Sequence, residues 1–316
     1  MLSRIPKSTL VPLALGSVYV FWGSTYAGIH IAGEHLTAPV VSAARCVLAA
    51  IMIAGLALLA GKSLRVAPGE FWKLVLIGFL FMSLNNTALT WAEQMVPSGF
   101  ASLVIATIPI MIALMETVLP DGERLNKLGW AGTLLGVAGM CLLVWPSIHH
   151  RTNLTGAERP VLGVLVLLFA SFAWSLGSVM SRRFNFQTDT FVATGWQLAA
   201  AAVFNTLFAF FIGGFRSSIW TPSGAAAVAY LAVCGSLFGL VAFTYLLKNV
   251  AVTKVAPYAF VNPVIAVLLG ALLFHERLVS AEFAGMAVIV CGVAMVVFSR
   301  TVRGKQEMAV AAPTPE

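Results

Sequence analysis

Aromatic and ionisable side chains that could handle a small solute recur inside long apolar stretches of this sequence. Trp22, Tyr26 and His30 follow one another at a spacing of four residues, which places them on one face of a helix. The two rings could shape or stack on a ligand. His30 could exchange a proton because the unperturbed pKa of histidine is about 6.5. The alternative for His30 is a hydrogen-bonded residue at the membrane interface.

A cationic side chain and two amides lie in the next apolar stretches. Arg45 lies about seven residues into its stretch, and its planar guanidinium suits a carboxylate on a substrate or on Glu34 or Glu93. Snorkelling of the long side chain to the interface is the alternative. Asn85 and Asn86 are adjacent, and we expect one of them to hydrogen-bond a polar solute in a cavity. Interhelical hydrogen bonding is the other interpretation.

The second half of the sequence carries a comparable set. Trp174 and Ser178 lie four residues apart on one helical face, and so do Tyr258 and Asn262. Gln197 is expected to face the first pair, although serines such as Ser178 also simply permit close helix packing. The side chains predicted to bind a substrate are Trp22, Tyr26, Arg45, Asn85, Asn86, Trp174, Ser178, Gln197, Tyr258 and Asn262.

Ionisable residues and prolines within apolar stretches suggest two further roles. His30, Glu93 and Glu116 are candidates for proton coupling, because ionisable groups in a membrane are costly and commonly functional. Pro109 and Pro263 each remove a backbone donor from a helix, so they are candidate hinges. Plain helix kinking is the alternative for both prolines.

The motifs of the common enzyme classes are missing from the sequence. His275-Glu276 lacks the second histidine of the zinc-binding HExxH pattern, and no phosphate-binding loop occurs. The four cysteines lie inside apolar stretches without the spacing of a disulfide framework or a zinc site. We therefore expect neither enzymatic activity nor a cofactor or metal.

The elements that carry these residues belong in a lipid bilayer. Hydrophobic residues make up 59% of the 316 residues and charged residues 10%, against roughly 45–50% and about 25% in soluble domains. Apolar stretches of about 20 residues can each cross a bilayer core as a helix, and backbone in lipid must bond internally. We predict an all-α polytopic membrane protein with ten transmembrane helices, near residues 9–31, 38–60, 71–91, 98–118, 128–145, 161–181, 191–213, 223–247, 252–274 and 281–299.

The formal charge of +7 is explained by topology rather than by nucleic-acid binding. If the N-terminus is cytoplasmic, Arg151, Arg159, Arg216 and Arg277 fall outside, Arg45 lies within a span, and the other basic residues fall inside. The positive-inside rule therefore predicts that both termini are cytoplasmic. The expected partners are the lipid bilayer of the inner membrane and a small-molecule substrate, with no nucleic acid.

An internal repeat divides the chain into residues 9–145 and 161–299, followed by a short disordered cytoplasmic tail at 300–316. A shift of 152 to 154 residues pairs Trp22 with Trp174, Arg45 with Gln197, and Pro109 with Pro263. Each copy has five helices, an odd number, so the second copy should be inverted relative to the first. Inverted copies can alternately expose a site between them. Glycines in the fifth and tenth stretches indicate close-packing seams, and they leave homo-oligomerisation open.

Three sequence segments carry a family resemblance. These are Trp22-Gly23-Ser24-Thr25-Tyr26, Pro97-Ser98-Gly99, and Tyr258-Ala259-Phe260-Val261-Asn262-Pro263 followed by Gly270 and Glu276. As a set they resemble the EamA-type transporters of the drug/metabolite transporter superfamily, from the first span to the tenth. The resemblance implies ten helices in two inverted repeats and export of amino acids or related metabolites. Glu116 matches no family pattern.

These observations predict a secondary transporter. It would export small polar metabolites such as amino acids by alternating access around a central cavity. The alternative is a membrane receptor or scaffold that moves no solute.

Overall fold

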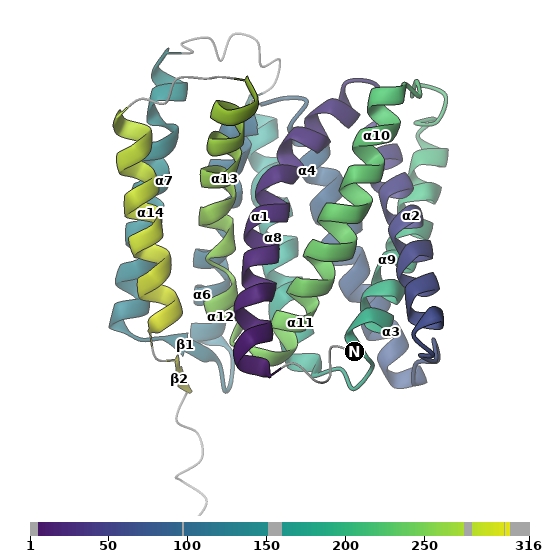
Figure 1. Ribbon diagram of the computed structural model, residues 1–316, viewed down its shortest axis with the longest axis horizontal. Helices are drawn as coiled ribbons and strands as arrows, with labels where there is room; N and C mark the ends of the chain where they lie inside the picture. Colours follow the sequence, from purple (N-terminus) through teal and green to yellow (C-terminus); the bar gives the residue numbers. More distant parts are fainter. Residues whose placement is uncertain (1–5, 97, 151–159, 275–279, 300, 304–316) are drawn as a thin grey trace, which may run out of the picture.

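Helices that run between two opposite ends dominate the computed structural model, which describes residues 6–96, 98–150, 160–274, 280–299 and 301–303. We call the end at which the first helix begins the lower end and the opposite end the upper end, as in Figure 1. The first half of the chain contains α1 (Lys7–Gly33), α2 (Ala38–Leu59), α3 (Pro68–Gly78), η2 (Phe79–Asn85), α4 (Asn86–Ala92), α5 (Ser98–Ile105), α6 (Ile108–Val118), β1 (Glu123–Leu125) and α7 (Lys127–His150).

The second half begins at the upper end and contains similar segments. They are α8 (Pro160–Phe184), α9 (Thr190–Phe211), α10 (Pro222–Tyr230), η4 (Leu231–Leu240), α11 (Val241–Asn249), α12 (Val252–Val255), α13 (Tyr258–Phe274), α14 (Ser280–Phe298) and β2 (Thr301–Arg303). Within each half, one segment continues from α-helix through a π-helical stretch, η2 or η4, into a further α-helix.

Among the described residues, six continuous helical segments are long and apolar enough to cross a membrane. They are Ser8–Gly33, Ala38–Leu59, Pro68–Ala92, Val161–Phe184, Thr190–Phe211 and Pro222–Asn249. Shorter apolar helices follow at Ile108–Val118, Lys127–Leu143 and Phe283–Phe298. The predicted class, an all-α polytopic membrane protein, is therefore confirmed. Within the described ranges, two three-residue strands are the only regular elements that are not helical.

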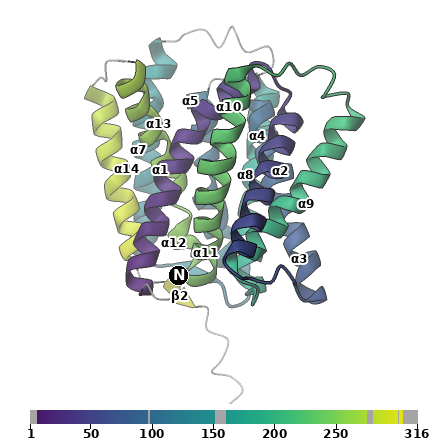
Figure 2. The same ribbon diagram turned by 45° about the vertical axis from the view of Figure 1, so that its right-hand side comes forward.

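Two helix pairs form the sides of the bundle. The helices α7 and α14 lie together on the left in Figure 1, and α2 lies beside α9 on the right, as the turned view in Figure 2 also shows. Glycines bring α7 and α14 into backbone contact: a Cβ at Gly139 would lie 2.8 Å from the amide nitrogen of Ile289. A Cβ at Gly285 would lie 2.6 Å from the amide nitrogen of Leu143. The predicted glycine seam thus lies within one chain.

The fourth apolar stretch is broken rather than continuous. Pro109 lacks an amide proton, and its ring would collide with the carbonyl group of Ile105 in an unbroken helix. The chain accordingly leaves the helix at Ala106 and Thr107, and the Thr107 hydroxyl donates to the carbonyl oxygen of Val104 at 2.7 Å. Pro109 follows as one of the first residues of α6.

The ninth stretch breaks at a different place from the one that the repeat predicts. Pro263 lies inside α13, and the helix continues through it. The break falls at Ala256 and Pro257, between α12 and α13. Proline has no amide proton to donate to the carbonyl group one turn earlier, so Pro257 ends α12 in this way.

The tail after α14 begins in ordered structure rather than in the disorder expected from residue 300. Thr301–Arg303 pairs antiparallel with Glu123–Leu125 at the lower end, with Arg303 opposite Glu123. The pairing gives hydrogen-bond partners to the backbone N–H and C=O groups of two short segments that belong to no helix. Residues 304–316, the remainder of the expected tail, lie outside the described residues.

Candidate functional site: a central cavity

A cavity of about 60 Å³ lies between the two halves of the chain. Its walls come from α1, α2, η2, α4 and the α5–α6 segment of the first half, and from α8, η4 and α13 of the second. Eight of the ten side chains predicted to bind a substrate line it: Trp22, Tyr26, Arg45, Asn85, Asn86, Trp174, Tyr258 and Asn262. Lining residues that the sequence analysis did not name are Thr25, Ile29, Met82, Leu89, Ile105, Ile108, Gly235 and Leu240.

Aromatic rings form one side of this cavity. The ring of Trp22 lies edge-on to Trp174 at 5.1 Å and to Tyr258 at 4.9 Å between centroids. Phe81 stacks on Trp174 at 4.4 Å, and Phe243 packs against Trp22 at 4.9 Å. Offset and edge-on pairs of this kind stabilise their packing beyond area burial. These five residues, the aromatic layer, come from both halves of the chain.

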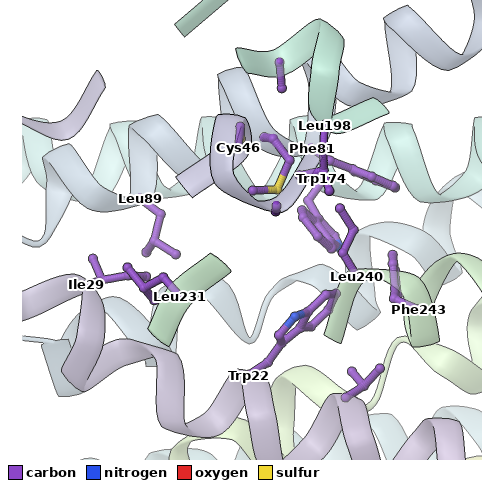
Figure 3. Close-up of a cluster of buried hydrophobic side chains, with 14 of the residues drawn as sticks. Trp22, Ile29, Cys46, Phe81, Leu89, Trp174, Leu198, Leu231, Leu240 and Phe243 are labelled. Carbon is purple, nitrogen blue, oxygen red and sulfur yellow. The ribbon is translucent and has the colours of Figure 1, made fainter. Parts of the chain in front are cut away.

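Aliphatic side chains gather on the other side. Figure 3 shows Ile29, Leu89 and Leu231 together, apart from Trp22 and Trp174. All three are buried, and Ile29 and Leu89 also line the cavity. Because Ile29 lies two helical turns above Trp22 on α1, this aliphatic group lies on the upper-end side of Trp22.

Arg45 brings the one charged side chain among the described residues that line the cavity. It is only 4% exposed. Its Nε donates to the hydroxyl oxygen of Ser236 at 2.9 Å. The carboxylate partners considered for Arg45 are not in place: Glu34 pairs with His30 at 3.6 Å, and among the described residues no ion pair joins Glu93 to Arg45.

A glycine of η4 makes room for Arg45. A Cβ at Gly235 would overlap with the Nη2 atom of Arg45, and one at Gly239 would overlap with the indole nitrogen of Trp22. Nε1 of Trp22 donates instead to the carbonyl oxygen of Gly235 at 2.9 Å. The π-helical stretch of the second half therefore holds two key side chains of the first half.

Both adjacent asparagines line the cavity, although we expected this of one. Asn85 ends η2, and its Nδ2 donates to the carbonyl oxygen of Ala170 on α8 at 2.9 Å. The Oδ1 atom of Asn86 accepts a long hydrogen bond of 3.4 Å from Ser42. Each amide thus combines interhelical bonding with exposure to the cavity.

Asn262 offers an unused acceptor. Its Oδ1 atom is buried and has no hydrogen-bond partner among the described residues. A buried polar atom without a partner is costly. In a cavity wall, such an atom is available to a bound solute.

Ser178 and Gln197 do not join the cavity. The hydroxyl of Ser178 donates to the carbonyl oxygen of Trp174 within the same helix at 2.7 Å. Gln197 is fully buried elsewhere, and its backbone carbonyl meets Gly78 of α3 so closely that a Cβ there would overlap with it. The repeat position of Arg45 therefore packs against another helix, which makes the cavity walls unequal in charge.

The three proton-coupling candidates lie apart from one another, and none of them lines the cavity. The side chain of His30 is 62% exposed at the upper end. Glu93 directly follows α4, with both carboxylate oxygens buried and without a hydrogen-bond partner among the described residues. Glu116 is 1% exposed at the lower end, where its Oε2 lies 3.5 Å from Nη2 of Arg183 and accepts a hydrogen bond of 2.6 Å from the amide of Glu123.

A polar network that the sequence analysis missed ties the halves together at the lower end. Nη2 of Arg182 lies 2.8 Å from Oε1 of Glu123, and Nη1 donates to the carbonyl oxygen of Lys248 at 3.0 Å. The other carboxylate oxygen of Glu123 accepts from the amide of Val252 at 3.1 Å, and the Thr253 hydroxyl donates to its carbonyl oxygen. Within the described ranges, all ion pairs that join the two halves lie at this end.

Known proteins resemble the chain in both sequence and fold. An inner membrane transporter of Escherichia coli strain K12, YedA, is 34% identical over 92% of either chain. The transporter YoaV of Bacillus subtilis is 24% identical over 92% of this chain and 97% of its own length. A solved crystal structure of 24% identity superposes with a TM-score of 0.75 over 92% of this chain and 96% of its own, which shows a common fold.

The family model extends across nearly the whole chain. It is described as the EamA-like transporter family, and it matches residues 10–145 and 161–298. Its two ranges coincide with the segments on either side of the cavity. The predicted resemblance is thereby confirmed, as is the predicted location in the inner membrane. This chain belongs to the EamA-like transporter family and is a multi-pass membrane transporter of the inner membrane.

Proposed function

We propose that this protein is a secondary transporter that exports small polar metabolites, amino acids among them, by alternating access. The observation that carries the proposal is the cavity itself. It holds amides and a guanidinium deep inside an apolar bundle, where polar groups are costly unless they have a function. It also lies between two halves of one chain, where relative movement of the halves would open it.

The arrangement is proposed to contain ten spans in two inverted repeats, over residues 9–145 and 161–299. Reciprocal packing supports this: α1 packs against η4 and α13, and α8 packs against η2 and the α5–α6 segment. A shift of 152 residues also carries the start of η2, Phe79, onto that of η4, Leu231. In addition, α2 and α7 pack against their own counterparts, α9 and α14.

Both termini are proposed to face the cytoplasm at the lower end. The start of α1 and the strand β2 both lie there (Figure 1). Of the basic side chains that the structure describes, Arg216 belongs to the upper end and Arg45 lines the cavity, and the lower-end group consists of Lys62, Arg65, Lys73, Arg124, Lys127, Arg182, Arg183, Lys248 and Lys254. This distribution supports the orientation through the positive-inside rule.

Lower-end contacts also suggest which step of the cycle this conformation represents. Glu123 and Arg182 connect the halves at the lower end, whereas the aliphatic residues Ile29, Leu89 and Leu231 gather on the upper-end side of Trp22. Apolar contacts of this kind separate without leaving charges unpaired. Opening at the upper end is therefore proposed as the next movement from this conformation, with release of the lower-end network as its counterpart.

Counterflow into proteoliposomes tests the proposal. Vesicles that contain purified protein and unlabelled amino acids or other small metabolites should accumulate the same labelled solute, and Asn86→Ala should reduce this exchange. Gln94→Ala provides a matched control, because it removes an exposed amide outside the cavity. Absence of exchange for every solute in a broad panel would favour a receptor or scaffold instead.

A further inference from the structure

Resting on the proposed function, we infer that the substrate is a small carboxylate: its anionic group binds Arg45 and its apolar body lies on the aromatic layer. Amino acids meet this requirement only in part. The matching acid that lacks the ammonium group should bind more tightly than the amino acid itself.

Arg45 is a buried charge without a carboxylate partner in the described structure. Arginine stays charged in proteins, and this one is 4% exposed within an apolar bundle. Its Nε is used by Ser236, a neutral hydroxyl. No carboxylate among the described residues lies within ion-pair distance of the guanidinium. A buried charge that lacks a counterion is strongly unfavourable, so a bound anion would supply what the chain itself does not.

The planar shape of the guanidinium restricts the kind of anion that Arg45 can bind well. The guanidinium presents a planar fork that matches the two oxygens of a carboxylate. Gly235 lies directly against Nη2, where any larger residue would overlap with the guanidinium, and both residues line the cavity. Ser236 holds the guanidinium through its hydrogen bond from Nε.

Charge balance separates acids from zwitterions. The described cavity wall contains Arg45 and no acidic side chain. A monoanion would neutralise the wall, whereas an amino acid would bring an additional ammonium group, and the described wall has no acidic side chain to pair with it. The acceptor of Asn262, Oδ1, is free for a hydroxyl or amide N–H on the substrate, but it carries no charge.

The volume of the cavity and the aromatic side chains beside it restrict the apolar part of the ligand. A volume of about 60 Å³ accommodates roughly four to six water-sized groups, because one water needs about 10–15 Å³ on this measure. Trp22, Trp174 and Tyr258 supply apolar surface beside it. A short aliphatic body therefore fits better than a large ring system.

A matched series of four ligands tests this inference. The series consists of butanoate, 2-aminobutanoate, butanamide and propylamine, which share one short aliphatic body and differ in charge. Binding of each is measured on purified full-length protein in lipid nanodiscs by competition against radiolabelled butanoate. Binding is preferable to flux here because neutral forms of the acid and amine cross lipid unaided.

The expected order is acid first, then the amino acid, with the amide and the amine at least tenfold weaker. Arg45→Gln should weaken binding of the acid about thirtyfold or more and abolish its advantage over the amide, as truncation of a buried charged partner does. Arg45→Lys should retain part of the advantage, because it keeps the charge without the fork. Arg216→Gln, which removes an exposed arginine at the upper end, should leave all four affinities unchanged.

The wild-type order alone can overturn the inference, even if an Arg45 variant fails to fold. Equal binding of acid and amide, tighter binding of the amino acid or the amine, or no binding of any of the four would each contradict it. Counterflow of other solutes would then still uphold the proposed transport function. Absence of both binding and counterflow would remove the two proposals together.

Discussion

Trp22 and Gly235 connect the two halves of the chain through a hydrogen bond in which Nε1 of the indole donates to the backbone carbonyl at 2.9 Å. The bond lies beside the cavity, where Trp22 also contacts Trp174 and Tyr258. Because the donor is on α1 and the acceptor on η4, any relative movement of these two elements must change this contact.

Replacement of Trp22 by phenylalanine keeps an aromatic ring and removes the donor. We expect a loss of about 1–3 kcal/mol in stability, since a buried carbonyl group loses its partner and ring area is lost. Thermal unfolding in detergent followed by counterflow measures both effects. Trp220→Phe is the control, because Trp220 is exposed at the upper end. An unchanged melting temperature for Trp22→Phe would contradict the importance of this contact.

Addition of one methyl group at Gly239 should displace Trp22. A Cβ at this position overlaps with the rigid indole, and overpacking of a buried site typically costs about 1–3 kcal/mol. We expect Gly239→Ala to lower both the melting temperature and the rate of counterflow. Gly55→Ala adds the same methyl group where no atom lies within 4 Å, so it should be neutral. Similar behaviour of the two variants would argue against this packing.

Loss of the Glu123–Arg182 pair should favour opening at the lower end. Both side chains are mostly buried, and the pair connects the two halves, so Glu123→Gln weakens a tie that must break during alternating access. The rate at which a membrane-impermeant thiol reagent labels Ser178→Cys, in a background without native cysteines, should rise several-fold from the lower side. That labelling rate reports on access below Trp174.

The exposed pair of Lys62 and Asp189 provides the control for this experiment. It also joins the halves at the lower end, but both side chains are more than a third exposed, and surface pairs contribute about 0–1 kcal/mol. Lys62→Gln should therefore leave the labelling rate nearly unchanged. Combination of Glu123→Arg with Arg182→Glu should recover part of the closed state. If Ser178→Cys is labelled no faster when Glu123→Gln is also present, the Glu123–Arg182 pair does not restrict access from the lower side.

Among the three proton-coupling candidates, Glu93 should matter most. Both of its oxygens are buried without a hydrogen-bond partner in the described structure, whereas Glu116 is held by Arg183 and by the amide of Glu123. Glu93→Gln should change the response of counterflow or efflux to a collapsed pH gradient, and Glu116→Gln should not. Asp121→Asn, which alters an exposed acid in a turn, serves as control. Transport that is insensitive to the gradient in the parent protein would end the coupling hypothesis.

Residue spacing in the sequence was sufficient to predict many of the side chains that line the cavity. The four-residue spacing of Trp22 and Tyr26, and of Tyr258 and Asn262, predicts shared helical faces, and all four side chains line the cavity. The same reasoning failed for Ser178, because a serine hydroxyl can bond to its own helix. Residue spacing predicts which side chains share one face of a helix, but it does not predict what packs against that face.

The positions of helix breaks, and the contacts between residues far apart in the sequence, do not follow from residue spacing. Pro257 ends α12, but the repeat pairs Pro109 with Pro263, which lies within an intact helix. Glu123 and Arg182 are 59 residues apart, and no local rule joins them. Likewise, Gln197 matches Arg45 in the repeat, yet it packs away from the cavity.

The sequence by itself determined that long apolar helices span a membrane, because helix length and backbone hydrogen bonding in lipid leave few other structures. It also determined which side chains share one helical face. Only the tertiary structure decided that Arg45 meets Ser236 instead of a carboxylate, and that the lower end is tied by Glu123 and Arg182. The physical reason is that neighbours, rotations and partners of helices depend on packing between distant segments, which the periodicity of each segment does not contain.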